Sequence, residues 1–363
     1  MATRSAAFRA SLPASIADAL AALIRSMNCY YSNLIEGHHT HPVDIERALK
    51  DDYSSDPEQR DLQLEAKAHI TVQTWIDEGG IDGHATTPEA ILELHRRFCE
   101  LIPHDLLKVE HPVTGETIPV MPGAIRNHDV EVGRHVAISP GAVPRFMNRM
   151  DKVYTRAGRI ESILTAACAH HRLLWIHPFL DGNGRVARLM SYAMLREALD
   201  TKGLWSLARG LARNEAEYKR HLMACDAPRK GDRDGRGTLS ESALAAFTRF
   251  FLQCCIDQVT FMEGLMSPNR LRDRILIWAE EEMRSGNLPA KSDTVLKAVL
   301  LQGELARADV VTLLSTTDRS ARRVTSALID GGALTSASTR APLQLAFPAK
   351  LAGRWMPGLF PEM

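Results

Sequence analysis

The spacing of apolar residues predicts that most of this chain is helical. Apolar positions recur every three to four residues, as they do in a helix that buries one face. The predicted helices cover residues 16–31, 45–50, 58–78, 185–200 and 240–266, with another around Ile163, Ala167 and Leu174. Few segments alternate between apolar and polar residues, so we expect a mainly α fold.

Residues 108–138 depart from this helical pattern. Val109, Ile118 and Val120 alternate loosely with polar residues, and Thr114-Gly115 marks a turn. This pattern is typical of one or two short β-hairpins.

The sequence changes character again beyond Pro268. Helices are predicted at 271–284, 292–302, 307–314 and 318–329, and strands at 334–335 and 344–347. Two helices joined by a turn and followed by two strands form the order of a winged helix-turn-helix. We therefore predict three parts: an N-terminal helical region (1–90), a central core (91–266) and a C-terminal winged-helix domain (267–363).

The last part has a modest basic character that allows two interpretations. Its candidate phosphate contacts are Arg319, Arg322, Arg323 and Arg340. Arginines on a helix-turn-helix could contact DNA phosphates. The alternative is that this domain serves for dimerisation or packing.

Composition limits the classes of protein to consider. The 363 residues include 44 Lys and Arg and 44 Asp and Glu, so the net charge gives no general preference for nucleic acid or membranes. No apolar run approaches the ~20 residues of a spanning helix, and the N-terminus lacks a signal-peptide pattern. Six cysteines without regular spacing indicate reduced thiols, so we expect a cytoplasmic protein without a membrane partner.

The run from His177 to Arg188, HPFLDGNGRVAR, concentrates groups that handle phosphate. Gly182 and Gly184 can adopt backbone conformations closed to other residues. With Asn183 between them, successive backbone N–H groups can form an anion-binding concavity. The turn precedes a predicted helix, whose N-terminus also favours an anion.

Charged and titratable side chains flank this turn. Arg185 and Arg188 share one helix face, and a guanidinium matches phosphate oxygens well. Asp181 offers hard oxygens to Mg²⁺, and His177 can take a proton near neutral pH. Each fragment alone is commonly a turn, a helix stop or a solvated face, but their order together predicts a phosphate site. Walker and protein-kinase motifs are absent.

This run resembles the signature of the Fic family, His-Pro-Phe-x-Asp/Glu-Gly-Asn-Gly-Arg-x-x-Arg, at every specified position. The resemblance implies a helical Fic core with a β-hairpin flap, and an enzyme that transfers AMP from ATP to a Tyr, Ser or Thr hydroxyl of a target protein. It implies that His177 is the general base and that Asp181 holds Mg²⁺. It also implies that the turn 182–184 cradles phosphate, that Arg185 contacts the phosphate chain and that Arg188 contacts the γ-phosphate.

A second motif, Ser32-Asn33-Leu34-Ile35-Glu36-Gly37, lies near the N-terminus. By itself it predicts a helix that ends at Gly37 with an exposed Glu36. It also resembles the inhibitory helix of many Fic proteins, Ser/Thr-x-x-x-Glu-Gly/Asn. The resemblance implies that Ser32 and Glu36 form an intramolecular brake in which Glu36 pairs with Arg188.

The resemblance also suggests less specific assignments. Val130 and Val132 would be the flap residues that clamp the target, although the hairpin could instead only pack on helices. Tyr218 would stack on adenine, or alternatively belong to the core. Two other functions stay open: a DNA-binding regulator with a nucleotide-sensing core, and removal of AMP by the same site. A homodimer is common in the family.

Overall fold

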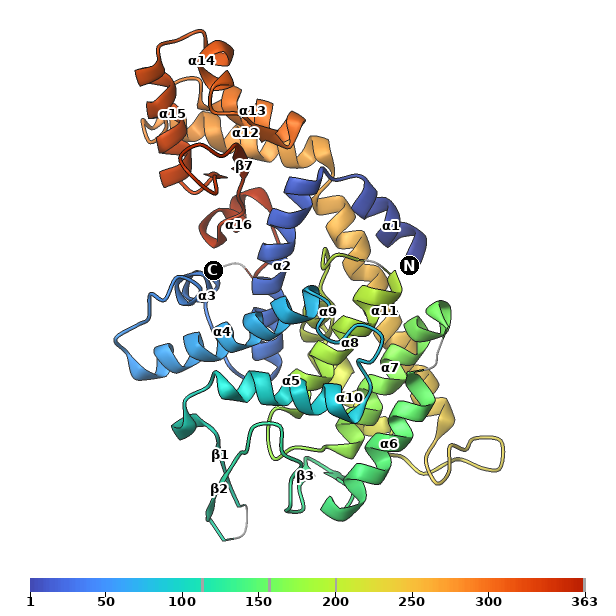
Figure 1. The fold of residues 1–363 in the computed structure, drawn as a ribbon. Coiled ribbons are helices and arrows are strands. Elements are labelled where there is room, and N and C mark those ends of the chain that lie inside the picture. Colours follow the sequence, from blue (N-terminus) through green and yellow to red (C-terminus); the bar gives the residue numbers. More distant parts are fainter. Residues whose placement is uncertain (112–113, 156–157, 200, 362–363) are drawn as a thin grey trace. The chain divides into compact units, whose positions relative to one another are not determined.

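The computed structural model describes residues 1–111, 114–155, 158–199 and 201–361. They form two compact units (Figure 1). One holds Met1–Ala2 and Asn28–Gln258, and the other holds Thr3–Met27 and the chain from Val259 onward. Helices α2 (Ala14–Ile35) and α11 (Glu241–Leu265) contribute residues to both units. The three-part division at residues 90 and 266 stays a prediction.

The first unit is built mainly from helices that follow one another with short connections. They are α3 (Pro42–Ala48), α4 (Pro57–Asp77), α5 (Pro88–Glu100), α6 (Val143–Tyr154), α7 (Arg159–Ile176), α8 (Asn183–Leu199), α9 (Leu207–Arg213) and α10 (Glu215–Ala224). Helix α8 packs against α4, α5, α7 and α9 and is buried along most of its length. Its buried residues include two arginines, Arg185 and Arg188, as well as apolar side chains.

Three of these helices begin in the same way, with a polar cap before a proline. His41, Asp56 and Thr87 precede Pro42, Pro57 and Pro88, and each cap side chain accepts a hydrogen bond from a backbone N–H of the first turn. Proline suits the first helical position because its missing N–H would have no partner there. The starts of α3, α4 and α5 are thus encoded locally.

Two short antiparallel hairpins lie between α5 and α6, as the sequence predicts. Strand β1 (Lys108–Glu110) pairs with β2 (Thr117–Pro119), with Val109 opposite Ile118. Strand β3 (Glu131–Val132) pairs with β4 (His135–Val136). Figure 1 shows both hairpins at the same edge of the first unit. The 3₁₀ turns His104–Leu106 and Pro140–Ala142 flank this region.

The second unit contains α1 (Ala2–Ala10) for the most part, α12 (Pro268–Arg284), α13 (Ser292–Gln302), α14 (Asp309–Leu314), α15 (Asp318–Asp330) and α16 (Ala349–Trp355). A small antiparallel sheet has the order β5 (Glu304–Leu305), β7 (Leu343–Leu345), β6 (Leu334–Thr335). The sequence predicted α12, α13, α14, α15 and two of the strands to within a few residues. It missed β5 and α16.

The prediction of a mainly helical chain is confirmed. Helix α2 ends at Ile35, two residues before Gly37, where the sequence predicts the end of this helix. Among the described residues, no helix combines the length and apolar character needed to cross a lipid bilayer.

Candidate phosphate-handling site

His177 ends α7 in a left-handed backbone conformation, with φ 51° and ψ 64°. This conformation is uncommon for a residue other than glycine, and Pro178 follows directly. The Nδ1 atom lies 3.3 Å from the carbonyl oxygen of Leu174. A proton on Nδ1 donates to that carbonyl, which leaves the lone pair on Nε2 available for an incoming proton.

The loop after His177 is fixed by contacts of its own side chains. The Phe179 N–H donates to Asn183 Oδ1 at 3.0 Å, and Asn183 Nδ2 donates to the Phe179 carbonyl at 2.9 Å. The Phe179 ring is fully buried and stacks on His95, with ring centroids 3.8 Å apart. The Asn183 side chain therefore shapes the turn, and only its backbone N–H is left for an anion.

The turn leads directly into the N-terminus of α8, which begins at Asn183. Gly182 has φ +80°, a conformation that other residues rarely adopt. The first N–H groups of a helix lack intrahelical acceptors, so those of Asn183, Gly184 and Arg185 are suited to phosphate oxygens. The predicted anion cradle and helix start thus coincide in space.

Arg188 is buried, with 4% of its surface exposed, and meets the end of α2. Its Nε donates to Ser32 Oγ at 2.8 Å, and its Nη2 donates to the Ser32 carbonyl at 3.2 Å. Nη2 also forms an ion pair with the Glu36 carboxylate. The structure therefore brings Arg188 together with Ser32 and Glu36, the two residues to which the resemblance linked it, across 156 and 152 positions of the sequence.

Gly184 allows this approach. A side-chain carbon added at Gly184 would collide with Glu36 Oε1 and lie 3.1 Å from Arg188 Nη1. The glutamate thus lies over the N-terminal turn of α8, directly beside the predicted phosphate cradle.

Arg185 has partners that the sequence analysis missed. It forms a buried ion pair with Glu65 of α4 and contacts Asp181 Oδ2 at 3.2 Å. The second oxygen of Glu65 lies 2.7 Å from His38 Nδ1. Glu65, His69 and Gln73 are buried at intervals of four along α4. Such a polar stripe at helical spacing is the signal that could have revealed them.

The carboxylates of this network are held in their charged form. Burial alone would raise the pKa of Glu36, but the Arg188 and Arg185 guanidinium groups outweigh it and lower that pKa. Burial likewise opposes ionisation of Glu65, and its contacts with His38 and Arg185 hold its pKa below the ordinary value. The hydrogen bond to Glu65 raises the pKa of His38.

Several buried histidines make stability sensitive to acid. Burial lowers the pKa of His177 and His95 to about 4, and that of His69 and His170 to about 3. Unfolded histidine titrates near ~6.5. Between these pH values the unfolded state binds more protons than the folded state. The free energy of unfolding is therefore not reduced by these histidines above pH ~6.5. It falls as the pH decreases, by up to ~1.4 kcal/mol per unit for each group.

Urea unfolding between pH 7.5 and 5 measures this dependence. We expect the midpoint to decrease steadily below pH ~6.5. His38 and His135, whose pKa values are raised by contacts with Glu65 and Asp226, act in the opposite direction and reduce the slope. A midpoint that stays constant or rises on acidification would contradict the expectation.

A single carboxylate near the cradle is suited to Mg²⁺. Asp181 is about half exposed, and its Oδ1 accepts a hydrogen bond from the Gly182 N–H at 2.6 Å. No cluster of three or more His, Cys, Asp or Glu side chains within the described ranges could hold a metal by itself. This fits Mg²⁺ at nucleotide sites, which takes one or two carboxylates together with substrate phosphates.

The buried Nε of Arg185 has no hydrogen-bond partner in the part of the chain that the structure describes, which leaves a donor for phosphate.

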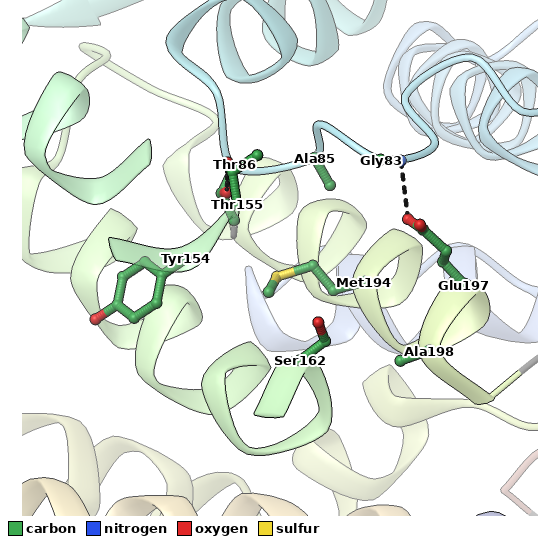
Figure 2. A pocket seen from close by; sticks show the side chains of 9 residues that line it. All are labelled: Gly83, Ala85, Thr86, Tyr154, Thr155, Ser162, Met194, Glu197 and Ala198. Carbon is green, nitrogen blue, oxygen red and sulfur yellow. Dashed lines mark hydrogen bonds between the residues drawn. The ribbon is translucent and has the colours of Figure 1, made fainter. Parts of the chain in front are cut away.

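Two of the cavities in the described part of the first unit are large enough to compare as sites. One of about 320 Å³ opens beside Asp181, Gly182 and Arg185 and gives access to the start of α8. The other, of about 350 Å³, is lined by Thr86, Thr155, Ser162, Met194 and other residues that Figure 2 labels. None of the motif residues 177–188 lines the second cavity, so we assign the chemistry to the first region.

The predicted flap residue Val132 is exposed, whereas Tyr218 is buried. Val132 lies in β3 with 52% of its surface exposed, and the Val130 carbonyl accepts a hydrogen bond from the Ala137 N–H at 3.2 Å. Tyr218 is buried, and its hydroxyl lies 2.6 Å from His170 Nε2. Its ring packs near Phe247 in the core. This arrangement favours the core alternative and gives no support to adenine stacking.

Comparisons with known proteins agree with the motif. Residues 85–195 match the model of the Fic/DOC family. The chain is 29% identical over 171 residues to protein adenylyltransferase Fic of Drosophila yakuba, covering 47% of this chain and 32% of that protein. It is 35% identical over 101 residues to the protein of the same name from Drosophila ananassae, covering 27% and 20%. The matched regions thus span about a third or less of these curated relatives.

A solved structure resembles the fold over most of the chain. The crystal structure of a Fic family protein from Desulfovibrio desulfuricans G20 matches with a TM-score of 0.50 and 16% identity, covering 89% of this chain and 86% of that one. At this identity the likeness concerns the fold alone. Residues 85–195 thus match the Fic/DOC family, and the fold of most of the chain resembles that of a solved Fic family protein.

Proposed function

We propose that this protein is an autoinhibited protein adenylyltransferase that transfers AMP from ATP to a Tyr, Ser or Thr hydroxyl of a target protein. The observation that carries the proposal is the position of His177, whose Nε2 is left available on the loop that leads into the N-terminus of α8. A proton acceptor next to an anion cradle is the arrangement that phosphoryl-group transfer to a hydroxyl needs.

In the proposed reaction the target hydroxyl oxygen attacks the α-phosphorus of ATP. A bond forms between this oxygen and the phosphorus, the bond to the bridging oxygen breaks, and pyrophosphate leaves. His177 Nε2 takes the hydroxyl proton. The N–H groups of the turn 182–184 bind phosphate oxygens, Arg185 contacts the phosphate chain and Arg188 binds the γ-phosphate. Asp181 would hold Mg²⁺, which would supply positive charge to the phosphates of the nucleotide.

The proposed brake acts by competition for Arg188. The Glu36 carboxylate already occupies this guanidinium, and it lies against Gly184 where a phosphate would approach. A nucleotide bound without Arg188 would have its α-phosphate out of line with the attacking hydroxyl, and ~1 Å of misplacement can cost ~100-fold in rate. Glu65 neutralises Arg185 in a parallel way. Removal of AMP is an alternative for the same site, with Glu36 orienting a water.

We place the target segment along the β3–β4 hairpin as an added strand, with Val130 and Val132 as clamping residues. The exposure of Val132 and Val136 supports this placement. All six cysteines are free thiols, which fits the proposed cytoplasmic location. Transfer of label from α-labelled ATP to protein tests the proposal and distinguishes it from a nucleotide sensor.

A second candidate function, DNA binding or regulation through a winged helix, is favoured by the surface of α15. Arg319, Arg322 and Arg323 are all exposed on this helix, and within the described ranges none forms an ion pair. They border one hollow together with Ser320 and Ser326. An unpaired row of guanidinium groups on the second helix of a helix-turn-helix suits a phosphate backbone. Homodimerisation through this domain is the competing proposal.

Gel shifts with a labelled DNA duplex at several salt concentrations test DNA binding. Replacing all three arginines by alanine is expected to reduce affinity and to lower the slope of log affinity against log salt by about 2.7, because each phosphate contact contributes ~0.9. The matched control replaces Arg272 and Arg284, which are ion-paired on α12. Equal affinity and slope for wild type and triple variant, or no binding at low salt, would exclude this function.

A further inference from the structure

Arg126 is a buried arginine that lies just before the β3–β4 hairpin. Only 3% of its surface is exposed. Its guanidinium donates to three backbone carbonyls: Nε to His177 at 2.7 Å, Nη1 to His128 at 2.7 Å, and Nη2 to Ile138. Its own backbone N–H donates to the Pro178 carbonyl at 2.9 Å. One side chain thus joins three separate points of the backbone.

Burying the Arg126 charge destabilises the folded protein unless hydrogen bonds from the protein replace those from water. Among the described residues no carboxylate lies within ion-pair distance of Arg126, and burial lowers its pKa. The carbonyls of His128, Ile138 and His177 take the place of water. The His177 carbonyl lies at the C-terminal end of α7, where the helix dipole favours a positive charge.

The three carbonyls belong to the base of the β3–β4 hairpin and to the loop that carries His177. His128 and Ile138 lie on either side of the β3–β4 hairpin, so the guanidinium closes the base of this hairpin. His177 carries the proposed base on the adjacent loop. A second side chain also links the hairpin to α7. His135 of β4 contacts the Trp175 carbonyl at 2.9 Å, and it contacts Asp226 at 3.1 Å. The hairpin is therefore anchored to the end of α7 through polar contacts.

We infer that Arg126 is a positioning residue that couples the β3–β4 hairpin to the backbone of His177. This inference rests on the proposed transfer reaction. A target strand added to the hairpin would present its hydroxyl at a position set by the hairpin, and the base nitrogen would be set by the His177 backbone. Because one rigid, planar guanidinium holds both, the distance between hydroxyl and base is fixed before the target binds.

The inference predicts an effect on turnover rather than on nucleotide binding. In a Glu36→Gly background, Arg126→Lys is expected to lower kcat by about 100-fold, because a lysine cannot bridge three carbonyls and ~1 Å of displacement costs that much. The KM for ATP should change less than about twofold, since the phosphate cradle is untouched. Added methylguanidinium should partly restore kcat in Arg126→Ala, whose cavity has the matching shape.

The matched control is Arg236, a half-buried arginine that also donates to backbone carbonyls, those of Cys225 at 2.6 Å and Ser240 at 3.2 Å. Arg236→Lys and Arg236→Ala should leave kcat nearly unchanged, and methylguanidinium should have no effect on them. Hydrogen exchange gives a readout that does not require activity. The backbone of residues 127–139 and 174–180 should exchange faster in Arg126→Lys than in Arg236→Lys.

The outcomes separate this inference from the proposed function. If Glu36→Gly transfers label but Arg126→Lys leaves kcat and hydrogen exchange unchanged, the role of Arg126 is wrong and the transferase proposal stands. Equal losses of kcat for the Arg126 and Arg236 variants would also overturn it, because they would indicate general destabilisation. If Glu36→Gly transfers no label at all, the transferase proposal fails and the role of Arg126 in transfer fails with it.

Discussion

Replacing Glu36 by glycine is expected to raise transfer of AMP to protein by about 100-fold, the size of effect that correct alignment of a reacting phosphate can produce. The substitution frees Arg188 from its carboxylate partner and clears the space above Gly184. Arg188 keeps its hydrogen bonds to Ser32, so its side chain stays near the cradle. Incorporation from α-labelled ATP with Mg²⁺, into the protein itself or a target lysate, measures the change.

The chain offers a close control for this substitution. Glu78 follows the end of α4 and precedes Gly79, just as Glu36 follows the end of α2 and precedes Gly37, and both glycines have positive φ. Glu78→Gly makes the same chemical change at a second helix end, without altering the contacts of Arg188. Label incorporation by Glu36→Gly that does not exceed that of Glu78→Gly would show that Glu36 is no brake.

Removing the base should abolish this gained activity. In the Glu36→Gly background, His177→Ala is expected to reduce label transfer by 10²- to 10⁴-fold, roughly the contribution of general base catalysis. The structure gives the reason: Nδ1 faces the Leu174 carbonyl, so Nε2 is the nitrogen that can accept the hydroxyl proton. Initial rates at saturating ATP measure the effect, because ATP binding through the turn 182–184 should persist.

Alanine at position 177 would also strain a backbone with φ 51°. His177→Asn avoids this problem, since asparagine tolerates the left-handed conformation but cannot act as a base near neutral pH. We expect the asparagine variant to fold with near wild-type stability and to be as inactive as the alanine variant. Activity within tenfold of the parent in His177→Asn would remove His177 from the mechanism.

The local parts of the site could be predicted because they are contiguous in sequence. The run from His177 to Arg188 contains a helix end, a glycine turn and a helix start, and backbone rules place these in order. The start of α8 at Asn183, two residues earlier than predicted, brings the turn itself into the helix N-terminus. The Asn183 side chain turned inward because the Phe179 backbone needed partners.

Contacts between distant segments were harder to predict. The pairing of Glu36 with Arg188 was expected only through resemblance to a family. The polar stripe on α4 could have indicated that Glu65 is buried, but no spacing rule pairs it with Arg185, 120 positions away. Arg126 was equally hidden, because its partners are backbone carbonyls that carry no sequence signal. Tyr218 shows the converse: the resemblance suggested stacking on adenine, but the side chain is buried and its hydroxyl lies 2.6 Å from His170 Nε2.

The bare backbone at Gly184 has a consequence for how this protein can change. The empty space above this residue admits the Glu36 carboxylate, and in the proposed reaction the same space admits a nucleotide oxygen. The Glu36 carboxylate and the nucleotide would then occupy the same space in turn. Any side chain at position 184 would exclude both of them. Permanent activation by a substitution at this glycine is therefore not expected, whereas loss of the Glu36 carboxylate would empty the same space for the nucleotide.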